Sequence, residues 1–419
     1  MVKTIEIPWG AWYNIPESVD LEFPDSWDIE VFRMKGSNTY LTKEEVANAI
    51  KNPNGMPPLH DIAKGKKTAT IVFEDISRPT KCEPICQEIV TQLSAAGIQD
   101  ENITFIAAIG SHRPMNRFDL LKKIGKSIVD RFNIENHHPY QNLVELGKSD
   151  RGTPIFVNKT YYDADVKIAI STVIPHPLAG FGGGAKIILP GISGIETLAA
   201  NHKAALEGKG VGVGFITELR EDIEEVCQRV GLDFSVNIIA AENREMAGIF
   251  AGDFIDAHRK AIELGKEVYG TNIPKIKEEQ KKFDIGIFNL FPEDTELSQS
   301  SKGTNLFLQA ENMLKEEAVV IFTTASPEGR GYHSLLGETG ALLYDEWKEA
   351  EEIFMEFCED KTFALFSPNL NRSDITHYWS KDMLFHQSFP KLLRMDQIQN
   401  ILPDHPKVAI FPTSIQLLV

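Results

Sequence analysis

Residues 165–191 read DVKIAISTVIPHPLAGFGGGAKIILPG, a short apolar run followed by a loop rich in proline and glycine. Apolar runs that end in such loops are typical of parallel strands buried on both faces of a sheet. The same form recurs at residues 68–73, 103–108, 283–289, 318–323 and 407–411. The sequence therefore predicts a fold built on mainly parallel sheets.

Helical segments lie between these runs. Residues 42–51 begin with Thr42 followed by LysGluGlu, a typical helix start. The apolar positions of residues 82–96 recur at helical spacing, and a glycine follows this segment and those at 216–230 and 257–269. Strands that alternate with helices predict the α/β class with right-handed crossovers.

A charged segment at residues 271–283 contains Pro274 and stands directly before a predicted strand. We place a domain boundary there, since a chain of 419 residues is long enough for two or three domains. The expected architecture is two α/β domains with mainly parallel sheets, residues 1–275 and 276–419, and an active-site cleft between them. As an alternative, the last segment packs back on the first domain.

The composition excludes several classes of protein. The chain has 43 Lys and Arg against 60 Asp and Glu, a net charge of −17, which makes it a poor binder of nucleic acids and of anionic membranes. No apolar segment approaches the roughly 18 residues of a transmembrane helix, and the N-terminus lacks the pattern of a secretory signal. The cysteines are too few and too scattered for a disulfide framework, which favours a reduced chain in the cytoplasm. They are Cys82, Cys86, Cys227 and Cys358.

Residues suited to chemistry concentrate in four loops after predicted strands, where ligands collect in open α/β sheets. The loops read DISRP at 75–79, GSHRP at 110–114, HPLAGFGGGAK at 176–186 and SQSSKG at 298–303. Cations placed there in an acidic chain indicate an anionic substrate or a phosphate, with ordinary surface charge as the alternative. These cations are Arg78, Arg113, Lys186 and Lys302.

The glycines of the loop at 176–186 have two interpretations. Gly182, Gly183 and Gly184 let the backbone approach a ligand, and their amides can form an anion-binding nest, but a purely structural turn is an equal alternative. The spacing matches neither a Walker loop nor the dinucleotide GxGxxG motif. Lys186 then provides a point charge or an amine nucleophile.

Three of the 11 histidines, His112, His176 and His202, lie in these loops or just after them. Histidine is the natural general acid/base near neutral pH and the commonest metal ligand. A single histidine is enough to hold a metal whose other ligands come from a cofactor. The adjacent His137 and His138 are interpreted as structural, and the remaining histidines carry no motif.

Together these motifs resemble the nickel-dependent lactate racemase family, the nickel-pincer-nucleotide 2-hydroxyacid racemases and epimerases. The resemblance covers most of the chain, from DISRP through GSHRP and HPLAGFGGGAKIILPGISG to the dipeptide NH at 201–202 and QSSK at 299–302. It implies an isomerase that racemises or epimerises a 2-hydroxy acid at C2 by proton-coupled hydride transfer. Lactate and a larger 2-hydroxy or sugar acid are equally compatible substrates.

The resemblance also implies a role for each site residue. Lys186 is the covalent attachment point of the nickel pincer nucleotide, a pyridinium-3,5-bisthiocarboxylic acid mononucleotide, and His202 is the protein ligand to nickel. His112 and His176 are the two acid/base catalysts. Further cofactor-binding residues are Asp75, Arg78, Gly182, Gly183 and Gly184, and the substrate-binding residues are Arg78, Gln299 and Lys302. Proteins that mature the cofactor are the expected partners, and the oligomeric state is left open.

Two positions depart from the family pattern. Gly182 stands where the family has a serine after the phenylalanine, and Ser298 stands before Gln299 where lactate-specific members have a tyrosine. A smaller polar residue at that position suits a larger or more polar 2-hydroxy acid. The alternative function is a cofactor-free α/β protein that binds phosphate or carboxylate and has no racemase activity.

Overall fold

The chain divides into two compact units. The computed structural model describes residues 2–10, 12, 18–207, 212–335, 360–378 and 382–419. The central unit comprises residues 36–268 and 333–343, and the terminal unit comprises residues 1–35, 269–332 and 344–419. No helix in the described ranges has both the length and the apolar character that a membrane span requires.

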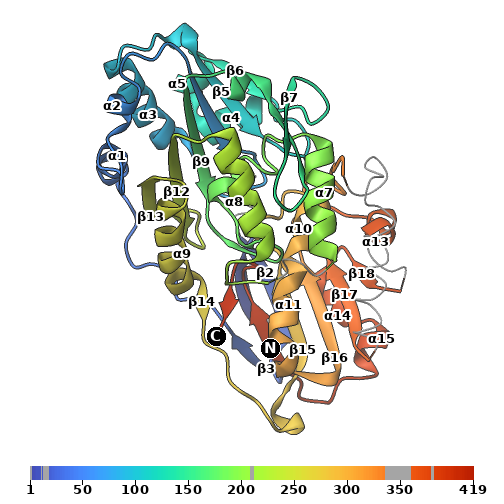
Figure 1. Cartoon of the computed structure of the whole chain (residues 1–419). Coiled ribbons are helices and arrows are strands. Elements are labelled where there is room, and N and C mark those ends of the chain that lie inside the picture. The colour runs from blue at the N-terminus through green and yellow to red at the C-terminus, as the bar shows by residue number, and fades with distance from the viewer. Residues whose placement is uncertain (1, 11, 13–17, 208–211, 336–359, 379–381) are drawn as a thin grey trace. The chain divides into compact units, whose positions relative to one another are not determined.

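The central unit is built on a six-stranded sheet (Figure 1). Its neighbouring strands pair in parallel, except that β12 and β13 are antiparallel. This arrangement confirms the predicted α/β class with mainly parallel sheets. In spatial order the strands are β13 (Met246–Gly252), β12 (Phe234–Ala240), β9 (Val166–Thr172), β4 (Ala69–Glu74), β5 (Ile103–Ala108) and β6 (Asn133–Asn136).

The first helix begins after the predicted Thr42, and the helix predicted at 216–230 ends at the predicted Gly231. Thr42 caps the first helix by a reciprocal capping box with Glu45, and Thr217 caps a later helix through the backbone amide of Arg220. Helices α1, α2 and α3 lie together, and α7 lies beside α8 (Figure 1). The helices are α1 (Lys43–Lys51), α2 (Leu59–Ile62), α3 (Glu83–Ala95), α4 (Arg117–Ile124), α5 (Lys126–Val129), α6 (Lys159–Tyr162), α7 (Ile195–Leu206), α8 (Glu218–Val230) and α9 (Asp256–Tyr269).

Smaller elements complete the central unit. They are the antiparallel pair β7 (Leu143–Lys148) and β8 (Pro154–Asn158), the short hairpin β10 (Pro175–His176) and β11 (Gly180–Phe181), and the 3-10 turns η1 (Asp100–Asn102) and η2 (Gly184–Ile187).

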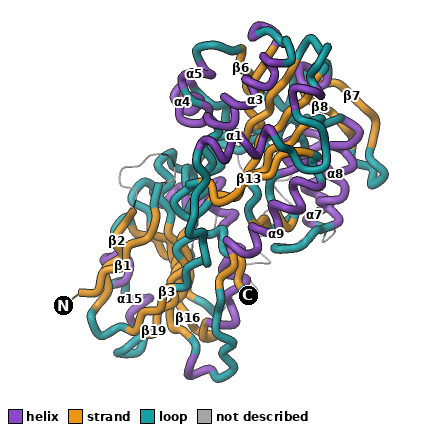
Figure 2. Tube along the Cα trace, turned by 90° about the vertical axis from the view of Figure 1, so that its left-hand side faces the viewer, coloured by secondary structure: helices purple, strands orange, loops and turns teal. Residues whose placement is uncertain are grey.

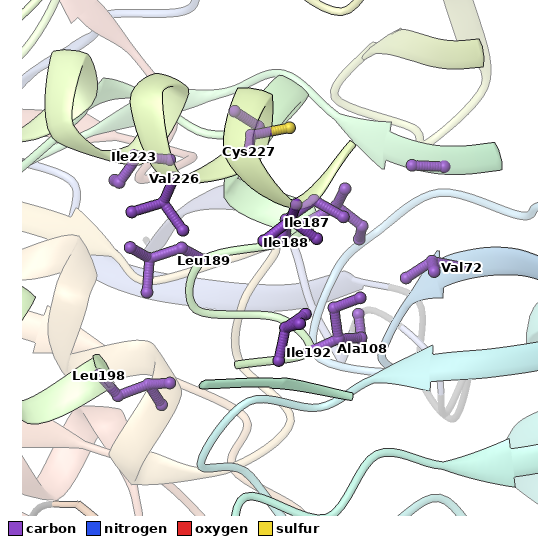
Figure 3. Packing of buried hydrophobic residues seen from close by; sticks show 14 of the residues in the cluster. Val72, Ala108, Ile187, Ile188, Leu189, Ile192, Leu198, Ile223, Val226 and Cys227 are labelled. Carbon is purple, nitrogen blue, oxygen red and sulfur yellow. The ribbon is translucent and has the colours of Figure 1, made fainter. Parts of the chain in front are cut away.

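An apolar core lies directly beneath the predicted glycine loop. Figure 3 shows Ile187, Ile188 and Leu189 packed with Leu198 of α7 and Val226 of α8. These side chains are almost completely buried. A Leu198→Ala substitution there is expected to cost about 2–5 kcal/mol. The core therefore fixes the backbone that carries Lys186 against two helices.

The terminal unit is built on a second six-stranded sheet, in which every neighbouring pair is parallel. The antiparallel hairpin of β1 (Val2–Pro8) and β2 (Ser18–Pro24) belongs to the same unit, and β3 lies beside β19 (Figure 2). In spatial order the sheet is β18 (Leu384–His386), β17 (Thr362–Phe366), β16 (Leu314–Thr323), β15 (Phe283–Asn289), β19 (Lys407–Phe411) and β3 (Asp28–Val31).

The remaining elements of the terminal unit are short. They are α10 (Leu297–Ser300), α11 (Asn305–Ala310), α13 (Arg372–Tyr378), α14 (Phe389–Leu393), α15 (Asp396–Gln399), the 3-10 turns η3 (Glu279–Lys281), η4 (Ser301–Thr304) and η5 (Glu311–Met313), and the strands β14 (Gly270–Thr271) and β20 (Leu417–Leu418).

The two units differ from the predicted segments 1–275 and 276–419. Asp28 pairs with Lys407 in the β3–β19 ladder, so the first 35 residues belong with the C-terminal sheet. Leu417 pairs with Gly270, so the last segment also stays in the terminal unit. Residues 333–335 return to the central unit. These pairings join segments that are distant along the chain, and local hydrophobic patterns carry no information about such partners.

Candidate active site

The predicted loops of the central unit meet at a reversal in strand order. The chain runs from β4 outward through β5 to β6, and then places β9 on the other side of β4. In open α/β sheets such a switch point, beyond the carboxyl ends of the strands, is the usual ligand site. Asp75 and Arg78 follow β4, His112 follows β5, and His176 and Lys186 follow β9.

Asp75 and His112 form a tight pair. The distance between Oδ2 of Asp75 and Nδ1 of His112 is 2.6 Å, and Oδ1 of Asp75 accepts hydrogen bonds from the amide and hydroxyl of Ser77. Burial alone raises the pKa of Asp75, but the charge and hydrogen bond of His112, together with Arg78 and Ser77, hold it well below its usual value. An ionised carboxylate only accepts hydrogen bonds, so Nδ1 of His112 carries a proton and Nε2 is the basic nitrogen when the ring is neutral.

A buried ion pair supports the start of the Asp75 loop. Nζ of Lys123 lies 2.9 Å from Oε1 of Glu74 and also donates to the carbonyl oxygen of Arg78. Both carboxylate oxygens of Glu74 accept hydrogen bonds from Thr172, at the end of β9. Lys123 is fully buried, so its charge is balanced within the protein. The network ties the ends of β4 and β9 together and positions Asp75 and Arg78.

His176 and Lys186, predicted for different roles, are in contact. The hairpin of β10 and β11 places His176 opposite Gly180, and Nε2 of His176 lies 3.1 Å from Nζ of Lys186. Nδ1 of His176 accepts hydrogen bonds from the amides of Leu178 and Ala179. The loop therefore brings an imidazole and a primary amine together after β9, the strand that lies beside β4 in the sheet.

The glycine amides largely serve the protein's own turn. Gly182 donates its amide to the carbonyl of Ile174, and Gly184 donates to the side chains of Ser171 and Asn237. Gly184 has a φ of +57°, and a Cβ there would lie 2.8 Å from the ring of His258. This pattern favours the structural interpretation of Gly182 and Gly184 over an anion-binding nest.

Arg220 holds the carbonyl side of the same loop. Its guanidinium donates to the carbonyl oxygens of Phe181, Gly182 and Gly183, and the side chain is fully buried on α8. Burial lowers its pKa to about 10, although Glu224 nearby opposes this effect. The sequence analysis missed Arg220, because one arginine in an amphipathic helix carries no signal of what it contacts.

His202 has the tautomer that a metal ligand requires. Its Nδ1 donates to the carbonyl oxygen of Leu198 at 2.8 Å, which leaves the lone pair of a neutral ring on Nε2. The neighbouring Asn201 is held by the buried carboxylate of Asp222. In the described ranges, no group of three His, Cys, Asp or Glu side chains could hold a metal ion.

His333 joins the site and was not predicted. It forms an antiparallel bridge with His112, and the centroids of the two rings are 5.4 Å apart. The hydroxyl of Ser111 lies 3.2 Å from Nε2 of His333, and the amide of Ser334 donates to the carbonyl of Ser111. A histidine more than 200 residues along the chain offers no local pattern that would associate it with the loop of His112.

Arg113 has a structural partner. Its guanidinium lies 2.7 Å from Asp119, which also forms the capping box of α4 with Asn116. This ion pair favours the alternative interpretation of Arg113 as ordinary surface charge.

Gln299 and Lys302 are in the terminal unit, on consecutive turns after β15. Nζ of Lys302 donates to Oε1 of Gln299 at 2.6 Å. Gln299 is fully buried, and its Nε2 has no hydrogen-bond partner within the described part of the chain. A buried amide of this kind costs free energy unless a ligand accepts its hydrogen bond. The preceding Ser298 donates to the carboxylate of Glu296.

Comparison with known proteins finds a family model that matches part of the chain. Residues 16–214 match the lactate racemase N-terminal domain, a segment that contains Asp75, His112, Lys186 and His202. In this segment the chain is similar to lactate racemases.

Two curated lactate racemases are similar in sequence. The protein from Lactiplantibacillus plantarum is 28% identical over 309 residues, which cover 71% of this chain and 70% of that protein. The protein from Thermoanaerobacterium thermosaccharolyticum is 26% identical over 362 residues, which cover 84% of this chain and 80% of that protein.

Two solved structures share the fold. The lactate racemase apoprotein from Thermoanaerobacterium thermosaccharolyticum has a TM-score of 0.77 at 22% identity and covers 100% of both chains. A crystal structure of a Thermotoga maritima protein has a TM-score of 0.68 at 18% identity and covers 91% of this chain and 99% of that one.

Proposed function

We propose that this protein is a member of the lactate racemase family and an isomerase that racemises or epimerises a 2-hydroxy acid at C2. One observation carries the proposal: two imidazoles lie on loops of the same sheet end, His112 held by Asp75 and His176 in contact with Lys186. Inversion at a carbinol centre needs a base for the hydroxyl proton of each enantiomer, and two separately held imidazoles suit that requirement.

The residues fit the nickel pincer nucleotide that the family resemblance implies. Lys186 offers a primary amine for covalent attachment, and His202 has a tautomer that presents Nε2 to a metal. When bound, the cofactor would supply the hydride acceptor and the nickel ion. From the loop after β4, Arg78 is proposed to support cofactor binding, whereas Asp75 contributes by orienting His112.

Side chains of the protein are proposed to transfer the hydroxyl proton of the substrate and to bind its carboxylate. Nε2 of His112 accepts the hydroxyl proton of one enantiomer, because Asp75 holds the ring with its proton on Nδ1. His176 serves the other enantiomer. Arg78, Gln299 and Lys302 are proposed to bind the substrate carboxylate or hydroxyl, and the buried Nε2 of Gln299 is a donor suited to that role.

The substrate is proposed to be larger or more polar than lactate, since Ser298 replaces a tyrosine of the lactate-specific members. Chiral chromatography of a panel of 2-hydroxy acids and sugar acids, incubated with the loaded enzyme, tests this choice. Turnover of a larger acid above that of lactate is expected. Turnover of lactate alone would show that Ser298 does not enlarge the substrate range.

Attachment of the cofactor to the chain tests the proposed racemase function itself. After co-expression with cofactor-maturation proteins, the proposed partners, intact mass should show the nucleotide on Lys186, and metal analysis should show nickel. The Lys186→Ala chain should gain neither mass nor activity. A chain that gains no mass and binds phosphate or carboxylate without turnover would support the alternative, a cofactor-free binding protein.

A cytoplasmic location is part of the same proposal. The described cysteines Cys82, Cys86 and Cys227 are buried and form no disulfide, whereas Cys358 lies outside the described residues. Burial raises the pKa of the Cys82 thiol to about 12. Protected, reduced thiols of this kind suit a reducing compartment.

A further inference from the structure

Asp222 of α8 is a buried carboxylate that joins this helix to two other segments of the central unit. Its Oδ1 accepts a hydrogen bond from the hydroxyl of Ser149 at 2.5 Å. Its Oδ2 accepts from the hydroxyl of Thr153 at 2.8 Å and from Nδ2 of Asn201, on α7, at 3.1 Å. All four side chains are almost completely buried. A buried carboxylate is stable only where donors surround it, so these bonds fix its position.

The turn between β7 and β8 is a closed base for this carboxylate. The amide of Ser149 donates to the carbonyl oxygen of Thr153, and the amide of Thr153 donates to the hydroxyl of Ser149. Both hydroxyls of the turn therefore reach Asp222 from constrained positions. The third hydrogen bond, from Asn201, adds the position of α7.

Asn201 lies in the turn of α7 that carries His202. One turn earlier, the fully buried Leu198 packs in the core that also contains Val226 of α8 (Figure 3). The carbonyl oxygen of Leu198 accepts the hydrogen bond from Nδ1 of His202 at 2.8 Å. The imidazole ring therefore takes its orientation from the backbone of α7, and any shift of that backbone moves the ring.

The start of α7 is held separately. The amide of Phe156, on β8, donates to the hydroxyl of Thr197 at 3.0 Å, and the amide of Gly194 donates to the carbonyl oxygen of Phe156 at 2.8 Å. A helix held at its first turn is still able to tilt. Apolar contacts farther along are non-directional, whereas a hydrogen bond to a charged acceptor has a defined geometry. The bond from Asn201 to Asp222 therefore sets the angle of α7 at the turn of His202.

We propose that Asp222 is a positioning residue for His202, which it holds through Asn201 in the orientation that nickel requires. Replacing an outer partner of a metal ligand commonly changes metal affinity by about ten- to a hundredfold. Here the outer partner acts through the helix backbone rather than through the ring itself. The inference rests on the proposed function, in which His202 is the protein ligand to nickel.

The rate at which the loaded enzyme loses nickel to EDTA tests this role. Asn201→Asp places two carboxylates against each other, and their repulsion should displace this turn of α7. Elemental analysis, normalised to the attached nucleotide by intact mass, should show about tenfold faster nickel loss. The added negative charge by itself attracts Ni²⁺ and would slow the loss, so the direction of the change identifies displacement of His202.

Two further variants make the test independent of one substitution. Asn201→Leu removes the donor without adding a charge and should also accelerate nickel loss. Exchange of the two side chains, Asn201→Asp together with Asp222→Asn, again places an amide against a carboxylate. The hydroxyl of Thr153 is able to accept a hydrogen bond from the new amide, since a hydroxyl is both donor and acceptor. The exchanged pair should therefore restore slow nickel loss.

Ser149→Ala is the matched control. It removes a hydrogen bond to the same carboxylate but leaves the bond from Asn201 to Asp222 in place. Urea titrations should show a lower free energy of unfolding for Ser149→Ala and for Asn201→Leu, whereas only Asn201→Leu should lose nickel faster. Equal acceleration in these two variants would reduce the role of Asp222 to general stability and overturn the inference.

Unchanged nickel loss in both Asn201→Asp and Asn201→Leu would also overturn the inference, and so would an exchanged pair that loses nickel as fast as Asn201→Asp. None of these results affects the proposed function, because each is measured on a chain that has gained the nucleotide. If loading adds no mass to Lys186, the proposed function fails, and the inference fails with it because no nickel site remains to be positioned. Intact mass therefore distinguishes the two failures.

Discussion

Asp75 and His112 follow different strands of the central sheet, yet their side chains are joined by a hydrogen bond of 2.6 Å between Oδ2 and Nδ1. The carboxylate is also held by Ser77 and is nearly buried. Its position therefore fixes both the orientation and the tautomer of the imidazole.

Replacing Asp75 should impair catalysis and spare loading. Asp75→Asn removes the charge that stabilises the protonated ring of His112, so turnover should fall about a hundredfold or more. Steady-state kinetics on the loaded variant measure the effect, and intact mass and nickel content should match those of the unsubstituted enzyme. Asp130→Asn, at an exposed carboxylate, is the control. Unchanged turnover in Asp75→Asn would remove the orienting role.

His333 should help to orient the imidazole ring of His112. Its imidazole packs against His112 and contacts Ser111 on the same loop, so His333→Ala should let His112 reorient and lower turnover about tenfold. His60→Ala, which removes a histidine bonded to Gln92, is the control. If the two variants are equally active after normalising for nickel, His333 has no part in positioning His112.

Substitution of His202 should separate nickel binding from covalent attachment. His202→Ala removes the Nε2 lone pair but leaves Lys186 intact, so the loaded chain should carry the nucleotide mass with a reduced nickel content. Lys186→Ala should lose both. Intact mass spectrometry and elemental analysis on the same samples measure the two quantities. Full nickel occupancy in His202→Ala would exclude it as the protein ligand.

Arg220 should be a stability determinant of the glycine loop. Arg220→Met leaves the carbonyls of residues 181–183 without their buried donor, and the free energy of unfolding should fall by about 3 kcal/mol. Arg229→Met, on the exposed side of the same helix, should change it by less than about 0.5 kcal/mol. Urea titrations of the three chains make the comparison, and equal losses in both variants would contradict it.

His137 should give the stability a defined pH dependence. Burial lowers its pKa from 6.5 to about 4 in the folded chain, so between these values the unfolded chain binds a proton that the folded chain does not. The contribution of His137 to the free energy of unfolding is complete above pH 6.5. It is lost as the pH falls towards 4, and this loss amounts to about 3 kcal/mol.

A variant isolates this contribution. His137→Gln should show a smaller loss of unfolding free energy on acidification than the unsubstituted chain, by that amount, in urea titrations at a series of pH values. His405→Gln, at an exposed histidine, should follow the unsubstituted chain. Parallel curves for all three chains would contradict the prediction.

Local features of the sequence were sufficient to predict many of the helices and strands. The strands at 103–108, 283–289 and 407–411 were predicted at the bounds found in β5, β15 and β19, because each is a continuous apolar run that ends in a turn. The start of α1 was predicted from Thr42, because capping involves residues within one helical turn. The loops that carry the site residues follow β4, β5 and β9, which the same kind of apolar run predicted at residues 68–73, 103–108 and 165–171.

The pairing of segments distant along the chain could not be predicted from the sequence. The β3–β19 ladder assigns the N-terminus to the terminal unit, and the bridge from His333 to His112 adds a third imidazole to the site. Likewise, the contact between Nε2 of His176 and Nζ of Lys186, and the cover of the glycine loop by Arg220, depend on how a hairpin and a helix pack. Residue types and their local order set the chemistry available to this chain, whereas the packing of distant segments sets which groups meet and with which protons.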